Sequence, residues 1–404
     1  MTRRPPESTA ERLRASPNFA LAFTQDGKPY VAKDSEPYIQ YWLTERYRVL
    51  LSLFSARRGA ASAEAIAAYC RLTGTAPSKS TNTALARAIA NMRDGGVLIG
   101  ARDDVSRYDA AMATHYVTYR PFPKQISDRI IADGGIGGDS RVLDLAGGPG
   151  DLALALARAS RRVSLMELSA GFVKAARARA RKLGLNLETL HESCNRLIYL
   201  DDAFDVITVS QALHWLDDVA VCRGVGQLLR PGGSFFVVHA AFDVPPTHPL
   251  HFLLGRQSVL GGKPAQPFAA EVQPLLRRLS LLFQALDAPD VDRANLGQAA
   301  VAANHGEVAR IAPVSVSLFR QRRPMGLGFA RAFLTPRHIE TSGQSEDAFW
   351  RDLQARCAGS GAAEIEGRFN WALLQFRRTA SAPKLPAVAK LPVTEIGYAG
   401  PPEI

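Results

Sequence analysis

The sequence lacks the features that mark disulfide-stabilised, zinc-binding and membrane-spanning proteins. Its 404 residues include four cysteines, which are scattered and show no close pairing of the kind found in disulfide frameworks or zinc sites. No apolar run reaches the length that crosses a bilayer, and the polar residues 1–17 lack the apolar centre of a signal peptide. We therefore expect a cytoplasmic protein with no metal and no membrane partner.

The positive charge of the chain is spread out. The net charge is +11, but the excess arginines are distributed along the whole sequence. Such a distribution is typical of a solvated surface and does not favour nucleic acid as a partner, although polyanions and acidic peptides stay open.

Residues 141–151 predict a strand, a glycine turn and a helix. An apolar run typical of a strand buried on both faces ends at Leu145. The glycines at 147, 148 and 150 allow a sharp turn and the close approach of a ligand, and Asp151 is a suitable helix N-cap. A helix N-terminus beside such a turn favours an anionic or polar ligand.

Strands and helices alternate from residue 142 onward, which predicts an α/β fold with a Rossmann-like parallel sheet and right-handed crossovers. A long, mostly helical insertion is expected at about 240–313, and a proline-rich tail at 380–404. The expected strands are 142–145, 162–166, 186–191, 204–209, 234–239, 314–319 and 369–376, and the later helices are 170–183, 324–334 and 346–357.

An acidic residue, Glu167, ends the strand after the glycine turn, 23 positions beyond Asp144. A carboxylate there can accept hydrogen bonds from ribose hydroxyls, as in dinucleotide-binding folds. A nicotinamide-binding domain is one alternative, but its Gly-x-Gly-x-x-Gly fingerprint differs from the Ala-Gly-Gly-Pro-Gly of residues 146–150.

The whole run resembles the class I S-adenosylmethionine-dependent methyltransferases, whose first motif is Asp-x-Gly-x-Gly-x-Gly. Residues 144–150 match it, with Ala146 in place of the first glycine; residues 204–207, 210–215 and 229–233 resemble three further motifs in the family's order. The resemblance implies a methyltransferase with S-adenosyl-L-methionine as cofactor. The implied cofactor residues are Tyr116, Asp144, Ala146, Gly147, Gly148, Gly150, Glu167, Leu168, Ser193, Cys194, Ser210, Gln211 and Ala212.

Within that set, the resemblance assigns Glu167 to the ribose hydroxyls and Gly148 and Gly150 to the methionine moiety. The family's usual adenine motif, Gly-Asp-Ala-Glu, is replaced by residues 192–195, Glu-Ser-Cys-Asn. The adenine-binding carboxylate is therefore missing or displaced, and the Ser193 hydroxyl or the Cys194 backbone N–H is expected to serve instead.

The segments 116–123 and 211–215 look like the branch that contains trans-aconitate methyltransferases, in which a tyrosine-bearing segment caps the cofactor. Tyr116 and Tyr119 are therefore candidate lids, unless residues 119–121 only form a turn into the next helix. The candidate catalytic residues are His214, Trp215 and Tyr119. His214 is a general base or a wall residue beside the cofactor, and Trp215 is favoured as a packing wall.

Weaker candidates lie further along the chain. His239 and His248 follow the strand at 234–239, and Arg320, Arg322 and Arg323 form either a carboxylate site or a surface charge run. No Asn-Pro-Pro-Tyr-like motif follows the strand at 204–209, which argues against methylation of the amino groups of nucleic-acid bases.

The N-terminal residues 17–105 predict a second, α+β domain, preceded by a loosely attached or disordered segment and followed by the methyltransferase domain at 106–379. Its strands precede its helices, in an order that resembles the winged-helix-like element that recognises precursor peptides in enzymes modifying ribosomally made peptides. The expected strands are 19–24, 30–33 and 38–42, and the expected helices are 44–54, 62–72 and about 83–93.

In that family the leader peptide adds as a strand, which here implies a groove between residues 38–42 and 85–92. An edge strand offers the unpaired N–H and C=O groups that such recognition uses. The leading hypothesis is a methyltransferase that modifies a ribosomally synthesised precursor peptide in natural-product biosynthesis. The alternatives are a methyltransferase of small carboxylates or secondary metabolites with an N-terminal dimerisation domain, and a non-catalytic winged-helix regulator that binds DNA.

Overall fold

The chain divides in the computed structural model into two compact units, residues 1–105 and 106–404. The structure describes residues 11–16, 19–23, 29–33, 40–54, 60–100, 110–120, 122–194, 197, 200, 203–216, 218–243, 268–286, 311–333, 339, 343–359, 364–379 and 385–398.

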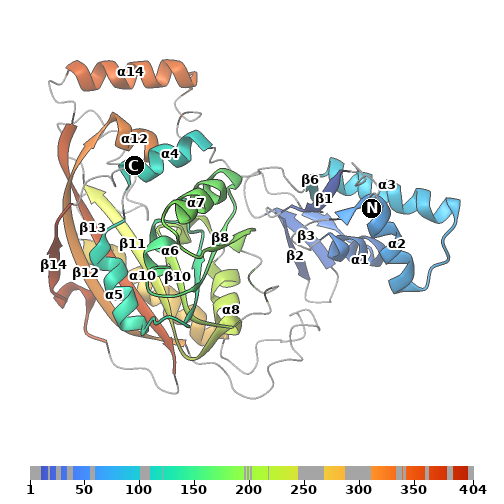
Figure 1. Ribbon diagram of the computed structural model, residues 1–404, viewed down its shortest axis with the longest axis horizontal. Coiled ribbons are helices and arrows are strands. Elements are labelled where there is room, and N and C mark those ends of the chain that lie inside the picture. Colours follow the sequence, from blue (N-terminus) through green and yellow to red (C-terminus); the bar gives the residue numbers. More distant parts are fainter. Residues whose placement is uncertain are drawn as a thin grey trace, which may run out of the picture. The chain divides into compact units, whose positions relative to one another are not determined.

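Three strands and three helices form most of the described part of the first unit (Figure 1). The strands pair antiparallel in the order β2-β3-β4. Helix α3 begins earlier than the sequence pattern predicts, because the Ser78 hydroxyl caps it by accepting the Thr81 N–H at 3.0 Å. The elements are β2 (Phe19–Phe23), β3 (Pro29–Lys33), β4 (Gln40–Trp42), α1 (Glu45–Leu53), α2 (Ser62–Thr73) and α3 (Lys79–Asp94).

A second small sheet corrects the expectation that the first sixteen residues are loosely attached. Strand β1 (Arg12–Ala15) lies between β5 (Ala60–Ala61) and β6 (Leu98–Gly100) and is antiparallel to both. Leu13 and Ala15 are buried in the core of this unit. Residues 12–15 are therefore part of the fold, because their alternate side chains cover apolar surface that the three helices leave open.

An eight-stranded sheet is the centre of the second unit (Figure 1). Its order is β14-β12-β13-β11-β10-β7-β8-β9, in which β9 to β11 run parallel and β13 lies antiparallel between β11 and β12. The predicted α/β, Rossmann-like fold is confirmed. The strands are β7 (Arg141–Leu145), β8 (Arg162–Glu167), β9 (Glu188–His191), β10 (Phe204–Ser210), β11 (Leu229–Asp243), β12 (Ile311–Gly326), β13 (Glu364–Arg378) and β14 (Val393–Ile396).

Helices cover both faces of this sheet. Val142 of β7 lies in a core shared with α5, α6, α7, α12 and α14, whereas the next residue, Leu143, lies in a second core shared with α8 and α10. The alternation follows from the two-residue period of a strand. The helices are α4 (Ala110–Tyr119), α5 (Lys124–Gly134), α6 (Asp151–Leu156), α7 (Ala170–Lys182), α8 (Asp218–Leu228), α10 (Phe268–Leu286), α12 (Leu327–Phe333) and α14 (Glu346–Gly359).

Three boundaries differ from the prediction near the antiparallel strands. Strand β11 continues to Asp243, inside the expected insertion, and the helix expected from residue 324 begins at Leu327. Both differences arise because β13 pairs with β11 as far as Asp243 and with β12 as far as Gly326. Residues 393–396 of the expected tail form β14, which adds to the sheet beside β12. Of the insertion, 244–267 and 287–310 lie outside the described residues.

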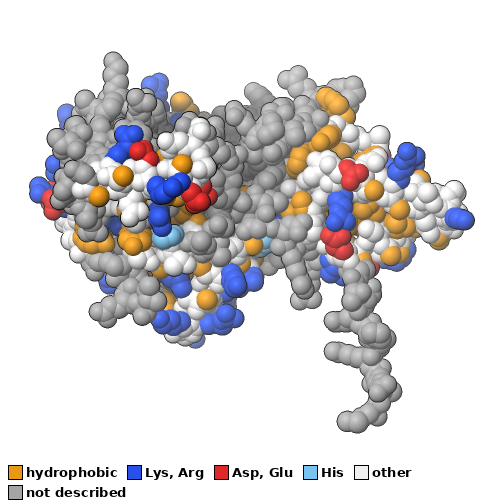
Figure 2. All heavy atoms as spheres, turned by 90° about the horizontal axis from the view of Figure 1, so that it is seen from above, with side chains coloured by type: hydrophobic (Ala, Val, Ile, Leu, Met, Phe, Trp, Pro, Cys, Tyr) orange, Lys and Arg blue, Asp and Glu red, His pale blue; other side chains and the backbone are white. Residues whose placement is uncertain are grey.

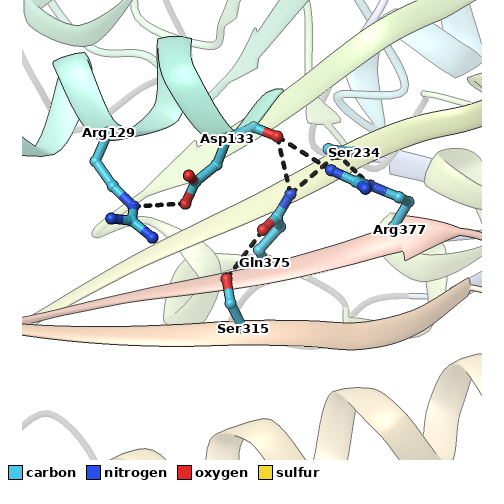
Figure 3. Close-up of polar contacts among 6 residues, drawn as sticks. All are labelled: Arg129, Asp133, Ser234, Ser315, Gln375 and Arg377. Carbon is cyan, nitrogen blue, oxygen red and sulfur yellow. Dashed lines mark hydrogen bonds and ion pairs between the residues drawn. The ribbon is translucent and has the colours of Figure 1, made fainter. Parts of the chain in front are cut away.

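A polar network fastens α5 to the antiparallel strands (Figure 3). The Asp133 carbonyl at the end of α5 accepts hydrogen bonds from Gln375 Nε2 at 3.2 Å and Arg377 Nη2 at 3.1 Å. The Gln375 side chain also donates to Ser234 and accepts from Ser315. This network joins β11, β12 and β13 on one face and leaves the opposite end of the parallel strands to the site described below.

The surface and the helices carry two further observations. On the face shown in Figure 2, Lys and Arg side chains lie in several separate groups, some of them beside Asp or Glu. Within the described ranges, none of the helices combines the length and apolar character that a membrane span needs.

Candidate active site

The candidate site lies where the strand order of the sheet reverses. From β7 the chain proceeds to β8 and β9 on one side, and then returns to β10 and β11 on the other. Such a switch point leaves a crevice at the carboxyl ends of the strands, where ligands bind in open α/β sheets. The predicted residues that follow β7, β8 and β10 are thereby brought to one edge.

The glycine turn after β7 has a backbone that requires small residues. Ala146, Gly148 and Gly150 have φ angles of +48°, +56° and +88°. Gly150 occupies the N-cap position of α6, so the expectation that Asp151 caps this helix is wrong. Asp151 is the first helical residue and forms an ion pair with Arg179 at 2.6 Å. At Ala146 the left-handed backbone costs about 1 kcal/mol, because the Cβ comes close to the following carbonyl oxygen. A methyl group is nevertheless small enough for this position.

Gly147 is required for a different reason. A Cβ at this position would lie 2.5 Å from Asp144 Oδ2 and 2.9 Å from Leu165 Cδ1. The backbone of the turn therefore lies directly against the Asp144 carboxyl group, and any larger residue would displace one of the two.

Asp144 is fully buried beneath the turn. Its Oδ1 accepts a hydrogen bond from the Thr208 hydroxyl at 2.6 Å, whereas Oδ2 has no hydrogen-bond partner among the described residues. Burial raises the pKa of Asp144 to about 7, and the hydrogen bond from Thr208 opposes this effect.

Stability should therefore depend on the ionisation of Asp144. Because its pKa is higher in the folded than in the unfolded protein, the folded state binds the extra proton below neutrality, and stability falls as pH rises toward 7. Relative to Asp144→Asn, the unmodified protein should lose about 2 to 3 kcal/mol of unfolding free energy between about pH 5 and pH 8. Urea unfolding of both proteins across this range measures the difference; parallel pH profiles would contradict the assignment.

Glu167 holds the turn from the adjacent strand. Its carboxylate accepts the Gly148 N–H at 2.8 Å and the Ser169 N–H at 2.7 Å, and the side chain is 7% exposed. A carboxylate has capacity for about four hydrogen bonds. Glu167 can therefore order the glycine turn and still accept from the hydroxyls of a ligand.

The segment predicted to bind adenine is compact and buried. Ser193 and Cys194 are 5% and 3% exposed, and the Leu168 carbonyl lies 2.9 Å from His191 Nε2. Burial raises the pKa of Cys194, and a backbone hydrogen bond from Ala146 places the thiol beside the glycine turn. The structure thus brings this segment to the turn, while Asn195 lies outside the described residues.

Arg120 is a residue that the sequence reasoning missed. Its guanidinium carbon lies 4.2 Å from the centre of the Tyr116 ring, and Nη2 donates to Gln211 Oε1 at 2.9 Å. Gln211 itself has a φ of +52° and donates its N–H to the Val238 carbonyl at 2.8 Å. Its position directly after the predicted lid residue Tyr119 could have indicated that Arg120 belongs to the site.

The predicted lid segment is helical in the structure. Tyr116 and Tyr119 lie on α4, and the Tyr116 ring packs edge-on against Phe172 of α7 at 5.4 Å. Tyr119 lies against Gly328 of α12, and its carbonyl accepts a hydrogen bond from Arg323. Tyr116 is thus connected through Arg120 to the residue after β10, while Tyr119 packs against α12.

The candidate catalytic residues after β10 lie in the short helix η2 (Leu213–Trp215). The rings of His214 and Trp215 are 5.1 Å apart, and Trp215 is 53% exposed. The His214 side chain reaches the surface, but partial burial disfavours its charged form and lowers its pKa to about 4. The neighbouring His239 and Arg120 lower the pKa to a smaller extent. The imidazole is therefore neutral at physiological pH, as a proton acceptor must be.

A second histidine forms a buried pair at the same sheet edge. His239 and Glu271 are 7% and 8% exposed, and His239 Nε2 lies 3.8 Å from Glu271 Oε2. The Phe268 ring lies parallel to the imidazole, at 5.9 Å. The sequence analysis named His239 but not its acidic partner, because Glu271 lies on α10, 32 positions later. His248 lies outside the described residues.

The three arginines of β12 do not form one site. Arg320 and Arg322 form exposed ion pairs with Glu395 and Glu366. Arg323 is 3% exposed and lies over the rings of Phe369 and Tyr398, and burial lowers its pKa to about 10. The surface-charge interpretation thus fits two of the three residues, and Arg323 joins β12 to α4.

The chain is similar to known methyltransferases over part of its length. Residues 142–233 match a family described as a methyltransferase domain. The ubiquinone/menaquinone biosynthesis C-methyltransferase UbiE of Cronobacter sakazakii is 32% identical over 123 residues, covering 29% of this chain and 48% of that protein. The corresponding protein of Klebsiella pneumoniae is 34% identical over 115 residues, or 27% and 45%. The chain spans about half the length of these relatives.

One solved structure of similar arrangement is a SAM-dependent methyltransferase from Thiobacillus denitrificans in complex with S-adenosyl-L-homocysteine. It is 16% identical, covers 66% of this chain and 95% of its own, and gives a TM-score of 0.38. The family match and the UbiE relatives show that this chain is similar to methyltransferases, with the family match at residues 142–233.

Proposed function

We propose that this protein transfers a methyl group from S-adenosylmethionine to a ribosomally made precursor peptide. The observation that carries the transferase part is the turn from Asp144 to Gly150, where no side chain fits at Gly147 and Glu167 holds the Gly148 N–H. The peptide part rests on the first unit, whose strand β4 lies at the edge of its described sheet.

The residues at the sheet edge fit this cofactor. Glu167 would accept from the ribose hydroxyls, Gly148 and Gly150 would lie along the methionine moiety, and Arg120 carries the charge to pair with its carboxylate. Ser193 and Cys194 would border the adenine. The bound cofactor supplies an electrophilic methyl group on a sulfonium.

The chain's own residues would orient the acceptor and control its proton. Tyr116, Trp215 and side chains of helix α12 would hold the acceptor atom in line with the methyl group. Such positioning supplies much of the acceleration in methyl transfer. His214, neutral at physiological pH, would take a proton when the acceptor must lose one.

An exposed strand edge supports the peptide acceptor. Strand β4 pairs with β3 on one side, and within the described residues no strand pairs with its other side. Trp42 at its end is 62% exposed, and the Tyr41 ring lies against Gly95 beside the end of α3. Backbone groups for strand pairing and an aromatic anchor are thus available together.

A second candidate acceptor is a small molecule, in which case the first unit would serve dimerisation. The relatives favour it, because they are named as C-methyltransferases of ubiquinone and menaquinone biosynthesis. A non-catalytic DNA-binding regulator is the third candidate, and salt-dependent duplex binding without methyl transfer would support it.

Substitution of Trp42 separates the first two candidates. The full chain is incubated with methyl-labelled cofactor and synthetic candidate precursor peptides. Trp42→Ser should reduce labelling of the peptide about tenfold or more at low peptide concentration, because an exposed aromatic anchor contributes roughly 2 kcal/mol. Leu72→Ser, at an equally exposed apolar residue of α2, is the matched control. Label found only on small molecules, or equal loss in both variants, would contradict the peptide acceptor.

A further inference from the structure

A groove on the first unit is lined by cations that form no ion pair with an acidic residue in the described part of the chain. It has a volume of about 890 Å³ and is lined by Arg46 and Tyr47 of α1 and by one face of α3 from Lys79 to Asn91. We name it the α1–α3 groove. It shares the α3 face at residues 87–91 with the predicted peptide site, but its other wall is α1 instead of residues 38–42, and it extends to the N-terminus of α3.

The cations of this groove differ from other arginines of the same unit. Arg12 and Arg93 form ion pairs with glutamates at 3.1 and 2.7 Å, and Arg48 forms an ion pair with Glu45. Among the residues that the structure describes, Arg46, Lys79 and Arg87 form no ion pair, and the residues that line the groove include no Asp or Glu.

The rest of the lining has the character of a peptide-binding surface. Ala84 and Ala88 supply a small apolar floor, and the Tyr47 hydroxyl accepts a hydrogen bond from Asn91 at 3.0 Å, which joins the two helices at one end. Helix α3 has no acidic residue in its first turn, so its positive N-terminal end adds to the charge of Lys79. A concave, partly apolar groove suits side chains of an extended peptide better than the phosphate backbone of a duplex.

The position of the groove relates it to the exposed strand edge. Strand β4 ends at Trp42, and α1 begins three residues later, at Glu45, directly before the lining residues Arg46 and Tyr47. The chain therefore passes directly from the edge strand into one wall of the groove.

We propose that the α1–α3 groove binds an acidic segment of the peptide that this protein modifies. The inference rests on the proposed peptide acceptor and adds the charge of the segment next to the paired strand. Three cations in a lining that contains no Asp or Glu favour carboxylate side chains of a ligand, and the attraction should weaken as salt screens it.

Binding of labelled peptides to the full chain tests this inference. The probe is a fluorescein-labelled twelve-residue peptide with four glutamates in an alanine and leucine background; glutamine replaces glutamate in the matched peptide. The double variant Arg46→Glu with Arg87→Glu should weaken binding of the glutamate peptide about tenfold and abolish its preference over the glutamine peptide. Arg71→Glu, an exposed arginine of α2 outside the groove, should change it less than about twofold.

The outcomes distinguish this inference from the proposed function. Equal binding of both peptides, an equal loss in Arg71→Glu, or tighter salt-dependent binding of a duplex DNA of similar charge would overturn the groove's assignment. Calorimetry with S-adenosylhomocysteine on the same variants should give unchanged affinity. If the unmodified chain fails to bind S-adenosylhomocysteine, the transferase proposal fails, whatever the peptides do.

Discussion

Glu167→Ala should weaken binding of S-adenosylhomocysteine by about a hundredfold. The substitution removes the acceptor of the Gly148 and Ser169 N–H groups, and with it the proposed contact to the ribose hydroxyls. Hydrogen bonds to a charged group contribute about 1.5 to 3 kcal/mol each, so the loss of one or two gives an effect of this size. Isothermal titration calorimetry measures the dissociation constant directly.

Glu188→Ala is the matched control for that experiment. Glu188 is also a carboxylate of the same sheet, and it accepts a hydrogen bond from Ser164 at 2.8 Å, but it lies at the start of β9, away from the turn. Its substitution should leave the dissociation constant within about twofold. An equal loss in both variants would mean that the effect comes from the sheet rather than from the site.

Gly147→Ala should lower the free energy of unfolding by about 2 to 3 kcal/mol and abolish cofactor binding. The added methyl group would lie 2.5 Å from Asp144 Oδ2 and 2.9 Å from Leu165 Cδ1, both of which are held in the core. The turn must move to relieve this contact, and its N–H groups then leave the positions that Glu167 fixes. Urea unfolding and calorimetry give the two effects separately.

Gly226→Ala provides the comparison, because a Cβ at Gly226 would meet nothing within 4 Å. Gly226 lies inside α8, where alanine has the higher helix propensity, so this variant should be more stable by about 0.5 to 1 kcal/mol. If Gly147→Ala binds the cofactor as the unmodified protein does, the close contact beneath the turn has no functional role.

The parallel part of the sheet could be predicted because its signals are local. Each buried strand reads as a short apolar run, and the glycine turn follows one of them within five residues. The antiparallel strands and β14 were harder, because their extent is set by pairing with segments far along the chain. Residues 324–326 have the composition of a helix start, but they remain in β12 through pairing with residues 364–366.

The site, like the sheet, could be predicted where its signals are local. The glycine turn and Glu167 follow from strand ends, and their hydrogen bond joins residues that are 19 positions apart. The links between Arg120 and Gln211 and between His239 and Glu271 depend on how α4 and α10 pack, which no local pattern records. The roles assigned to His214, Trp215 and Tyr119 stay predictions.

Titration of the full chain with S-adenosylhomocysteine tests the central claim most directly. We expect saturable binding at one site per chain, with a dissociation constant in the micromolar range or below, and weaker binding by about a hundredfold in Glu167→Ala. An absence of binding at high micromolar concentration, with a folded protein, would contradict the assignment of the glycine turn to this cofactor.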